Sequence, residues 1–259
     1  MYNVYCRDKT VSAKNELRKY DLLGLLWRNS YSGSNHIGNM TSLFRILIPS
    51  DENDFCEKYF AYAEQHKDLP IKYRGLTYDE FVELVKSYME NANKLIVKQY
   101  DYDTYFNCVL CHVITETYDG KIQETEFMNF LRGLGYQCCY FEGDIDAKYG
   151  VDIKVIRNDG RVSAIQIKPI TFFKSNRTDV VRDRMNICHK YENAYKELGI
   201  KTYYAIYKKD RMTGKVLWLK NGNGYRFKIN ELCSYDSNNI DTTFKDIPFV
   251  EDLHILGEV

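Results

Sequence analysis

Proline is scarce in this chain, with four among 259 residues, and none of the four marks a linker between domains. The sequence also lacks internal repeats and low-complexity segments, which excludes solenoid architectures and compositionally biased tracts. A chain of this length forms either one large domain or a core with an extension. Its apolar content of 44% is sufficient for a buried core.

Long apolar runs are absent as well. No stretch reaches the roughly 18 apolar residues that a membrane-spanning helix needs, so we expect no membrane partner. The amino-terminal segment lacks the apolar centre of a secretory signal peptide. Both absences favour a cytoplasmic protein, in which the eight cysteines stay reduced.

One cysteine motif requires an interpretation. Cys108, Cys111 and His112 match the C-x-x-C-H pattern of covalent haem attachment. That reaction normally requires an exported protein, and the motif lies in an apolar segment, so we interpret it as structural and expect no haem. A zinc site is not indicated either, because no second C-x-x-C pair stands at a suitable distance.

The net charge is zero, with 36 basic and 36 acidic residues, but the charges are unevenly distributed. The segment from Lys154 to Lys228 carries 18 Lys+Arg against 6 Asp+Glu, a net charge of +12, which leaves −12 on the remainder. A basic segment of this kind is typical of proteins that bind a polyanion. The alternative is that the two parts of the chain neutralise each other in the fold.

Residues 1–118 have the apolar spacing of helices. Helices are expected over residues 12–29, 77–97 and 105–118. Residues 28–42 are rich in Gly, Ser and Asn with little periodicity, which predicts a long loop. We therefore expect a helical N-terminal region over 1–118 that contributes to target recognition.

Residues 119–259 show a different pattern, in which a helix is followed by three strands, a second helix and further strands. The expected strands lie near residues 136–141, 151–156, 162–168, 201–209 and 216–220, and the second helix covers 178–198. Residues 142–150 are expected to form a polar connection. This order predicts an α/β fold with a mixed sheet flanked by helices.

The two central strands bring polar residues together. Asp152 lies at the start of one strand, and Gln166 and Lys168 lie at the end of the next, across a short turn. The start of a strand faces the end of its partner in an antiparallel hairpin, so we expect Asp152 near the other two. Gln166 and Lys168 are two residues apart and leave the same face of the strand.

This group suits the hydrolysis of a phosphodiester. Mg²⁺ prefers oxygen ligands, and Asp152, the backbone carbonyl of Ile167 and the Gln166 amide could supply them. A bound cation lowers the pKa of water, and Lys168 could orient that water or stabilise negative charge. The alternative is a surface hairpin with an ordinary ion pair between Asp152 and Lys168.

A carboxylate from the preceding helix extends the group. Glu124 stands three residues before Phe127 and seven before Leu131, which places it beside the apolar stripe of the expected helix. A carboxylate next to a buried face is costly without a partner, and a metal shared with Asp152 would be one. The alternative is a boundary glutamate that reaches water.

Two groups of residues carry a resemblance to a known family. The first group belongs to the helix and its end: Gly120, Glu124, Gly135 and Tyr136. The second belongs to the two strands: Gly150, Asp152, Gln166 and Lys168. In their order and spacing they resemble the nuclease core of the PD-(D/E)xK superfamily, in particular the pattern of Mrr-like and type II restriction endonucleases. The resemblance covers about residues 120–170, a fifth of the chain.

The resemblance implies a restriction-endonuclease-like fold and assigns roles to individual residues. Asp152 would be the metal-binding acid, Gln166 and Lys168 the second half of the motif, and Glu124 an accessory acid. The implied metal ligands are Asp152, Ile167, Glu124 and Gln166, and the implied cofactor is Mg²⁺, with Mn²⁺ as a substitute. The commoner pattern has an acid at position 166, so the glutamine removes one negative charge from the metal site.

The implied function is Mg²⁺-dependent cleavage of double-stranded DNA at a specific sequence. A homodimer is expected if both strands are cut at a palindrome. Two alternatives stay open: a repair or junction-resolving nuclease on the same core, and a non-catalytic DNA-binding protein with a decayed site. The glutamine at position 166 is the argument for the second alternative.

Candidate DNA-binding residues lie in two segments. One cluster surrounds the start of the helix over 178–198, where side chains can hold phosphates: Lys174, Arg177, Arg182 and Arg184. The expected loop over 28–42 offers side chains for reading bases: Asn35, His36 and Asn39. The alternatives are a solvated helix face for the first cluster and an ordinary turn for the second.

Overall fold

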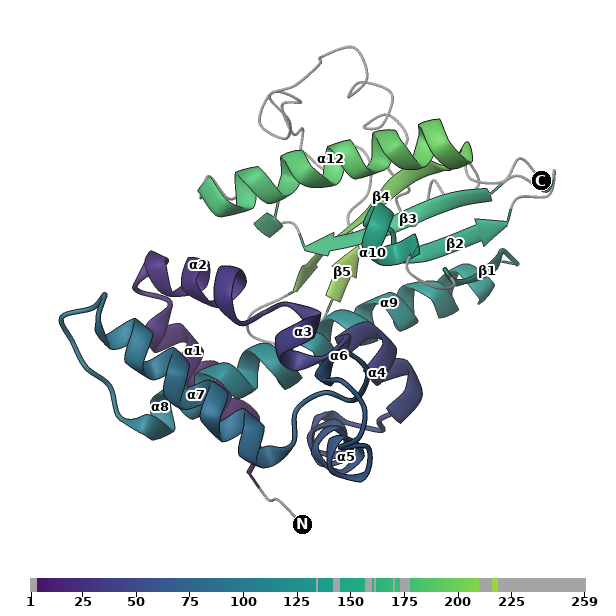
Figure 1. The fold of residues 1–259 in the computed structure, drawn as a ribbon. Coiled ribbons are helices and arrows are strands. Elements are labelled where there is room, and N and C mark those ends of the chain that lie inside the picture. Colours follow the sequence, from purple (N-terminus) through teal and green to yellow (C-terminus); the bar gives the residue numbers. More distant parts are fainter. Residues whose placement is uncertain are drawn as a thin grey trace. The chain divides into compact units, whose positions relative to one another are not determined.

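A computed structural model gives the fold of the chain (Figure 1). It describes residues 4–133, 135–141, 145–156, 160, 162–169, 171–172, 178–209 and 216–218. The chain divides into two compact units, residues 1–122 and 123–259. Within the described ranges, no helix combines the length and the apolar character needed to cross a membrane.

The first unit is helical throughout its described part, as the apolar spacing predicts. Its helices are α1 (Arg7–Leu17), α2 (Asp21–Ser30), α3 (Ser34–Ile37), α4 (Met40–Leu47), α5 (Glu52–Gln65), α6 (Ile71–Arg74), α7 (Tyr78–Asn93) and α8 (Tyr102–Leu110). A π-helical turn, η1 (Cys111–Thr115), joins α8 to α9 (Glu116–Gly133), which continues into the second unit.

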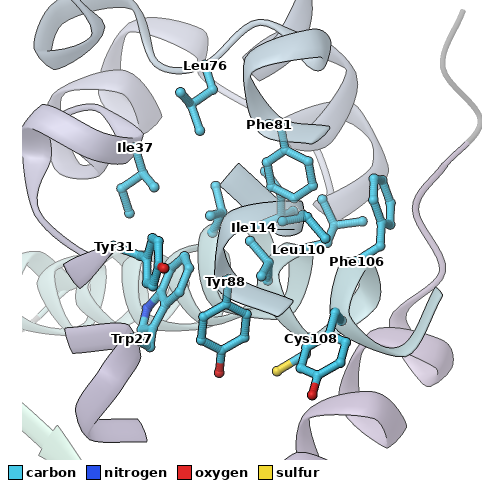
Figure 2. Close-up of a cluster of buried hydrophobic side chains, with 14 of the residues drawn as sticks. Trp27, Tyr31, Ile37, Leu76, Phe81, Tyr88, Phe106, Cys108, Leu110 and Ile114 are labelled. Carbon is cyan, nitrogen blue, oxygen red and sulfur yellow. The ribbon is translucent and has the colours of Figure 1, made fainter. Parts of the chain in front are cut away.

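Aromatic residues dominate the core of the first unit (Figure 2). On α7, Phe81, Val85 and Tyr88 are buried and recur at helical spacing, so one face of this helix meets the core. Thr77 caps the same helix, since its hydroxyl accepts from the backbone N–H of Glu80 and the Glu80 carboxylate accepts from Thr77 N–H. This capping box fixes the start of α7.

The prediction of a long loop over 28–42 is wrong. Helix α2 extends to Ser30, α3 forms a single turn, and α4 begins at Met40. Asn39 caps α4, because its side-chain oxygen accepts from the backbone N–H of Ser42 at 3.2 Å. The polar composition thus reflects caps between short helices rather than a loop.

A close backbone crossing explains the glycine in this segment. Gly38 has φ of 91°, in the left-handed region, and a Cβ added there would lie 2.8 Å from the Cα of Gly75. Only glycine permits both the conformation and the approach. The helix expected over 12–29 is likewise two helices, because the chain turns at residues 18–20 between α1 and α2.

The second unit contains a five-stranded mixed sheet in the order β1-β2-β3-β4-β5. Its elements after α9 are β1 (Gln137–Tyr140), α10 (Ile145–Tyr149), β2 (Ile153–Ile156), β3 (Val162–Pro169), α12 (Thr178–Leu198), β4 (Lys201–Lys209) and β5 (Val216–Trp218). Only β3 and β4 run parallel, and α12 connects them. The predicted α/β arrangement with a mixed sheet is confirmed, but the expected polar connection over 142–150 contains α10.

Each face of this sheet carries its own core cluster, and α9 and α12 lie on opposite sides of the sheet (Figure 1). Ile153, Ile165 and Ile167 pack with Phe127 and Leu131 of α9 on one face. The other face packs with α10 and α12 through a second set of side chains: Phe141, Tyr149, Val151, Ala164, Tyr191 and Ala194. Side chains alternate along a strand, so even-numbered residues of β3 face α12 and odd-numbered residues face α9.

Candidate active site at the end of the sheet

The carboxylate of Asp152 is held at the end of the β2–β3 ladder. The backbone N–H of Asp152 donates to the Ile165 carbonyl at 2.9 Å, which extends the antiparallel pairing by one residue. Its Oδ2 accepts from the Ile167 backbone N–H at 2.7 Å and from the Gln166 side-chain amide. The proximity of Asp152 and Gln166 predicted from the hairpin is confirmed.

Gln166 is 4% exposed and lies on the face covered by α12. Because its Nε2 donates to Asp152, its Oε1 is turned the other way, toward Gly150. A buried side-chain amide normally needs partners for both its N–H and C=O groups. Gln166 therefore lies between the Asp152 carboxylate and Gly150.

Lys168 does not form the ordinary ion pair of a surface hairpin. It lies two residues beyond Gln166 on the same face of β3, and it makes no salt bridge with any described residue. Its Nζ stands 5.6 Å from the centroid of the Phe172 ring, a cation–π distance. The half-buried ammonium thus has an aromatic neighbour but no described carboxylate.

Glu124 is buried, with 7% of its surface exposed, whereas the neighbouring acid Glu126 is exposed. It lies on the inward stripe of α9 with Phe127 and Leu131, as predicted. Helix α9 covers the face opposite to Gln166, so Glu124 approaches the sheet from the other side.

The structure does not assemble a carboxylate-rich metal site from the described residues. In that part of the chain, no group of three or more His, Cys, Asp or Glu side chains is placed to hold a metal ion. The oxygen donors at the sheet end are the Asp152 carboxylate, the Gln166 amide and the Ile167 backbone. This donor set suits a hard cation that keeps most of its water ligands.

Gly150 joins the sheet end to α12. Its backbone N–H donates to Asp146 at 2.8 Å and its φ is 65°, so it ends α10 in the left-handed conformation. A Cβ added there would lie 3.4 Å from Cδ of Lys190, 3.8 Å from Oε1 of Gln166 and 3.9 Å from Cε1 of Tyr191. Lys190 thus borders the site, although no sequence motif identifies it.

Helix α10 is fastened to α12 by polar contacts. The Lys148 ammonium and the Tyr149 hydroxyl both donate to Glu197, at 2.7 Å and 2.6 Å. The Lys148 hydrogen bond holds the pKa of the Glu197 carboxyl below its ordinary value. These contacts fix the position of α10, and with it Gly150, against α12.

The predicted DNA-binding residues are only partly described. Arg182 is exposed on α12, whereas Lys174, Arg177 and the side chain of Arg184 lie outside the described residues. Asn35 and His36 are exposed on α3, and Asn39 is the cap of α4. The interpretation of these three as loop residues is therefore corrected, and their role in base reading stays a prediction.

The C-x-x-C-H motif belongs to the core of the first unit. Cys108 and Cys111 are each 2% exposed, and burial raises the pKa of the Cys108 thiol to about 12. His112 stacks on Trp27 with ring centroids 4.9 Å apart, and its Nδ1 lies 2.7 Å from Glu116. Burial lowers the pKa of His112 to about 3, with further lowering by Lys14 and Arg28.

Comparisons of the chain with family models, curated proteins and solved structures returned no match. Function is therefore inferred from the chemistry of the sheet end and from the charge of the chain. The same fold can carry many activities, so the named side chains rather than the α/β architecture must support the inference.

Proposed function

We propose that this protein is a Mg²⁺-dependent endonuclease that cleaves double-stranded DNA at a specific sequence. One observation carries the proposal: Asp152 and Gln166 are in contact at the sheet end, with Lys168 on the same face and without a described carboxylate partner. The resemblance of this segment to the PD-(D/E)xK pattern supports the same assignment. A restriction-endonuclease-like fold for residues 119–259 is part of the proposal.

The donor set fits a weakly held divalent cation. Asp152 would hold it together with the Ile167 carbonyl, and Gln166 would contribute Oε1 after rotation of its amide. Glu124 is a further candidate from α9. When bound, Mg²⁺ polarises the phosphate and lowers the pKa of a water molecule, and Mn²⁺ would substitute for it.

The protein's own groups prepare the site for a phosphodiester. The Ile167 N–H fixes the orientation of the Asp152 carboxylate, which removes the entropy cost of ordering it during the reaction, and the Gln166 amide holds the same carboxylate before a cation binds. Lys168 can orient the attacking water and stabilise charge on the phosphate as a new P–O bond forms and the ester bond breaks. A lysine paired to a carboxylate would be less available for this role.

The charge of the chain supports a polyanionic substrate. The segment from Lys154 to Lys228, with its net charge of +12, includes β3, α12 and β4. We propose that Lys174, Arg177, Arg182 and Arg184 contact phosphates near the start of α12. Asn35, His36 and Asn39 are candidates for reading bases, and a homodimer would match a palindromic site.

Plasmid cleavage tests the proposal. The purified full chain is incubated with mixed-sequence plasmid and Mg²⁺, beside Asp152→Ala and Lys168→Ala. Discrete fragments from the wild type and none from the variants are expected. Smears or a preference for branched DNA would replace the restriction assignment with a repair or junction-resolving nuclease, and full cleavage by either variant would refute the assigned site.

A non-catalytic DNA-binding protein is a second candidate, and one observation favours it. Gln166 and the Ile167 N–H both donate to Oδ2 of Asp152, so two N–H groups occupy an oxygen that a cation would otherwise bind. A site adapted to lose its metal would look the same. DNA binding without any Mg²⁺- or Mn²⁺-dependent products would establish this alternative.

A further inference from the structure

We propose that Lys190 of α12 is a second phosphate-binding residue of the site, acting on the same substrate phosphate as Lys168. The inference rests on the proposed function and adds a residue that no sequence motif marks. The chemical class of its ligand is a non-bridging oxygen of a DNA phosphate.

The surroundings of Gly150 place the Lys190 side chain. Its Cδ lies 3.4 Å from the position of a Cβ on Gly150, and the Gln166 Oε1 lies 3.8 Å from the same point. The lysine stem and the amide oxygen therefore converge on one glycine. The ammonium is two bonds beyond Cδ, so the length of the side chain allows it to reach a phosphate bound beside Gln166.

Lys190 and Lys168 come from different elements but serve one face of the sheet. Lys168 lies two residues beyond Gln166 along β3, and Lys190 approaches Gln166 from the overlying helix. A phosphate on this face would meet a cation from the strand and a cation from the helix. Two lysines act as separate point charges, which suits a diester whose oxygens point in different directions.

The helix carrying Lys190 is held firmly enough to position it. Tyr191 and Ala194 of α12 are buried in the cluster shared with Ala164 of β3 and with α10. Lys190 itself is half-buried, and its aliphatic stem packs near Gly150. Packing of the stem lowers the rotamer entropy lost when the ammonium binds a phosphate.

The glycine at position 150 is explained by its backbone conformation. A side chain there would occupy the space between the Lys190 stem and the Gln166 amide. The left-handed φ of 65° favours glycine. A Cβ there would make only ordinary contacts with Lys190 and Gln166, so the backbone conformation is the reason for glycine at this position.

The test compares Lys190→Gln and Lys190→Arg with a matched control, Lys196→Gln. Lys196 is on the same helix, its side chain is 71% exposed, and it stands 3.9 Å from Glu192. Binding to a labelled duplex is measured at several salt concentrations, and single-turnover cleavage with Mg²⁺ is measured in parallel. Thermal unfolding of each variant checks that the fold is retained.

Lys190→Gln should reduce the slope of log affinity against log salt by about 0.9, the contribution of one phosphate contact. Its cleavage rate should fall at least about tenfold, with Lys190→Arg recovering much of both. Lys196→Gln should change neither. Equal behaviour of Lys190→Gln and Lys196→Gln, with an active wild type, would overturn this role alone; a wild type that neither binds nor cuts DNA would overturn the proposed function and this role together.

Discussion

Two cationic side chains, Arg74 in the first unit and Lys168 in the second, differ in the partners that surround them. Arg74 has 8% of its side chain exposed and binds both oxygens of Glu80 at 2.7 Å, with further bonds to the carbonyls of Leu69 and Gly75. Lys168 in the second unit has an aromatic ring nearby and no ion pair with a described residue. The first cation is satisfied by the protein, and the second is open to an external anion.

The same contrast extends to the surrounding residues. In the first unit, Arg7 pairs with Glu52 and Asp119, and Lys14 pairs with Glu116. A buried charge is costly unless it is paired, so such contacts indicate structural roles. Lys168 has no described carboxylate partner, although it lies near an ordered aspartate. This arrangement indicates a site where an anionic ligand supplies the negative charge that pairs with the lysine.

The largest expected effect on stability comes from breaking the structural pair. Arg74→Met should reduce the free energy of unfolding by about 3–5 kcal/mol, because Glu80 and two carbonyls lose their donor. Lys168→Met should change it by less than about 0.5 kcal/mol, as expected away from buried networks. Urea denaturation of both variants checks this, and equal effects would remove the distinction between the two cations.

His112 provides the next test, because it is buried and neutral in the first unit. Its pKa is about 3 in the folded protein and about 6.5 when unfolded, so the unfolded state binds the proton first as pH falls. Stability is therefore lost below about pH 6.5, by about 1.5–2 kcal/mol between pH 6.5 and 5.

The measurement is urea denaturation across this pH range, with His112→Gln as control. The glutamine cannot be protonated, so the variant should lack this part of the pH dependence. If both proteins show the same slope between pH 6.5 and 5, His112 is not held neutral by burial.

Gly150→Ala tests the junction of α10 and the sheet end. The left-handed conformation should cost about 1–2 kcal/mol of stability, and the added methyl group would make ordinary contacts with Lys190 and Gln166. Gly160 also has positive φ, at 80°, but open space around it, so Gly160→Ala is the matched control for strain alone. Cleavage should fall further in Gly150→Ala than in Gly160→Ala, because the strain at Gly150 lies beside Gln166; equal activity would show that the junction after α10 does not position the site.

The smallest expected effect concerns the charge at position 166. Gln166→Glu adds a carboxylate beside Asp152, which should lower the Mg²⁺ concentration for half-maximal cleavage by roughly tenfold, or about 1.4 kcal/mol. A Mg²⁺ titration of cleavage measures it. An unchanged Mg²⁺ concentration for half-maximal cleavage would mean that residue 166 does not contribute to binding the cation.

Strong periodicity and local chemistry made parts of the fold predictable. Helix α7 has both an apolar stripe and the Thr77 capping box, and β4 was expected over the residues it occupies. The contact between Asp152 and Gln166 was predictable because an antiparallel hairpin fixes which residues face each other. These features depend on neighbours in sequence or on a single turn.

Other features depend on contacts between distant residues and could not be predicted in this way. Helices α3 and α4 were hidden by a composition typical of loops, since their junction is fixed by Gly38 passing Gly75. Helix α10 was not predicted, because its segment is short and polar and its packing against α12 depends on the tertiary fold. Lys190 was missed because only the tertiary fold brings it to Gly150, and the opposite approach of Glu124 depends on which face α9 covers.

The most direct test of the site compares two lysines on the same face of the same sheet. Lys154 lies opposite Ala164, two residues beyond Asp152 in the chain, and like Lys168 it makes no ion pair with a described residue. Single-turnover cleavage of a duplex with Mg²⁺ is measured for Lys168→Ala and Lys154→Ala. Each variant loses one positive charge, so a difference between them reports the position of the lysine. We predict a loss of at least about a hundredfold for Lys168→Ala and less than about threefold for Lys154→Ala. Equal rates for the two variants would contradict an active site at the end of the sheet.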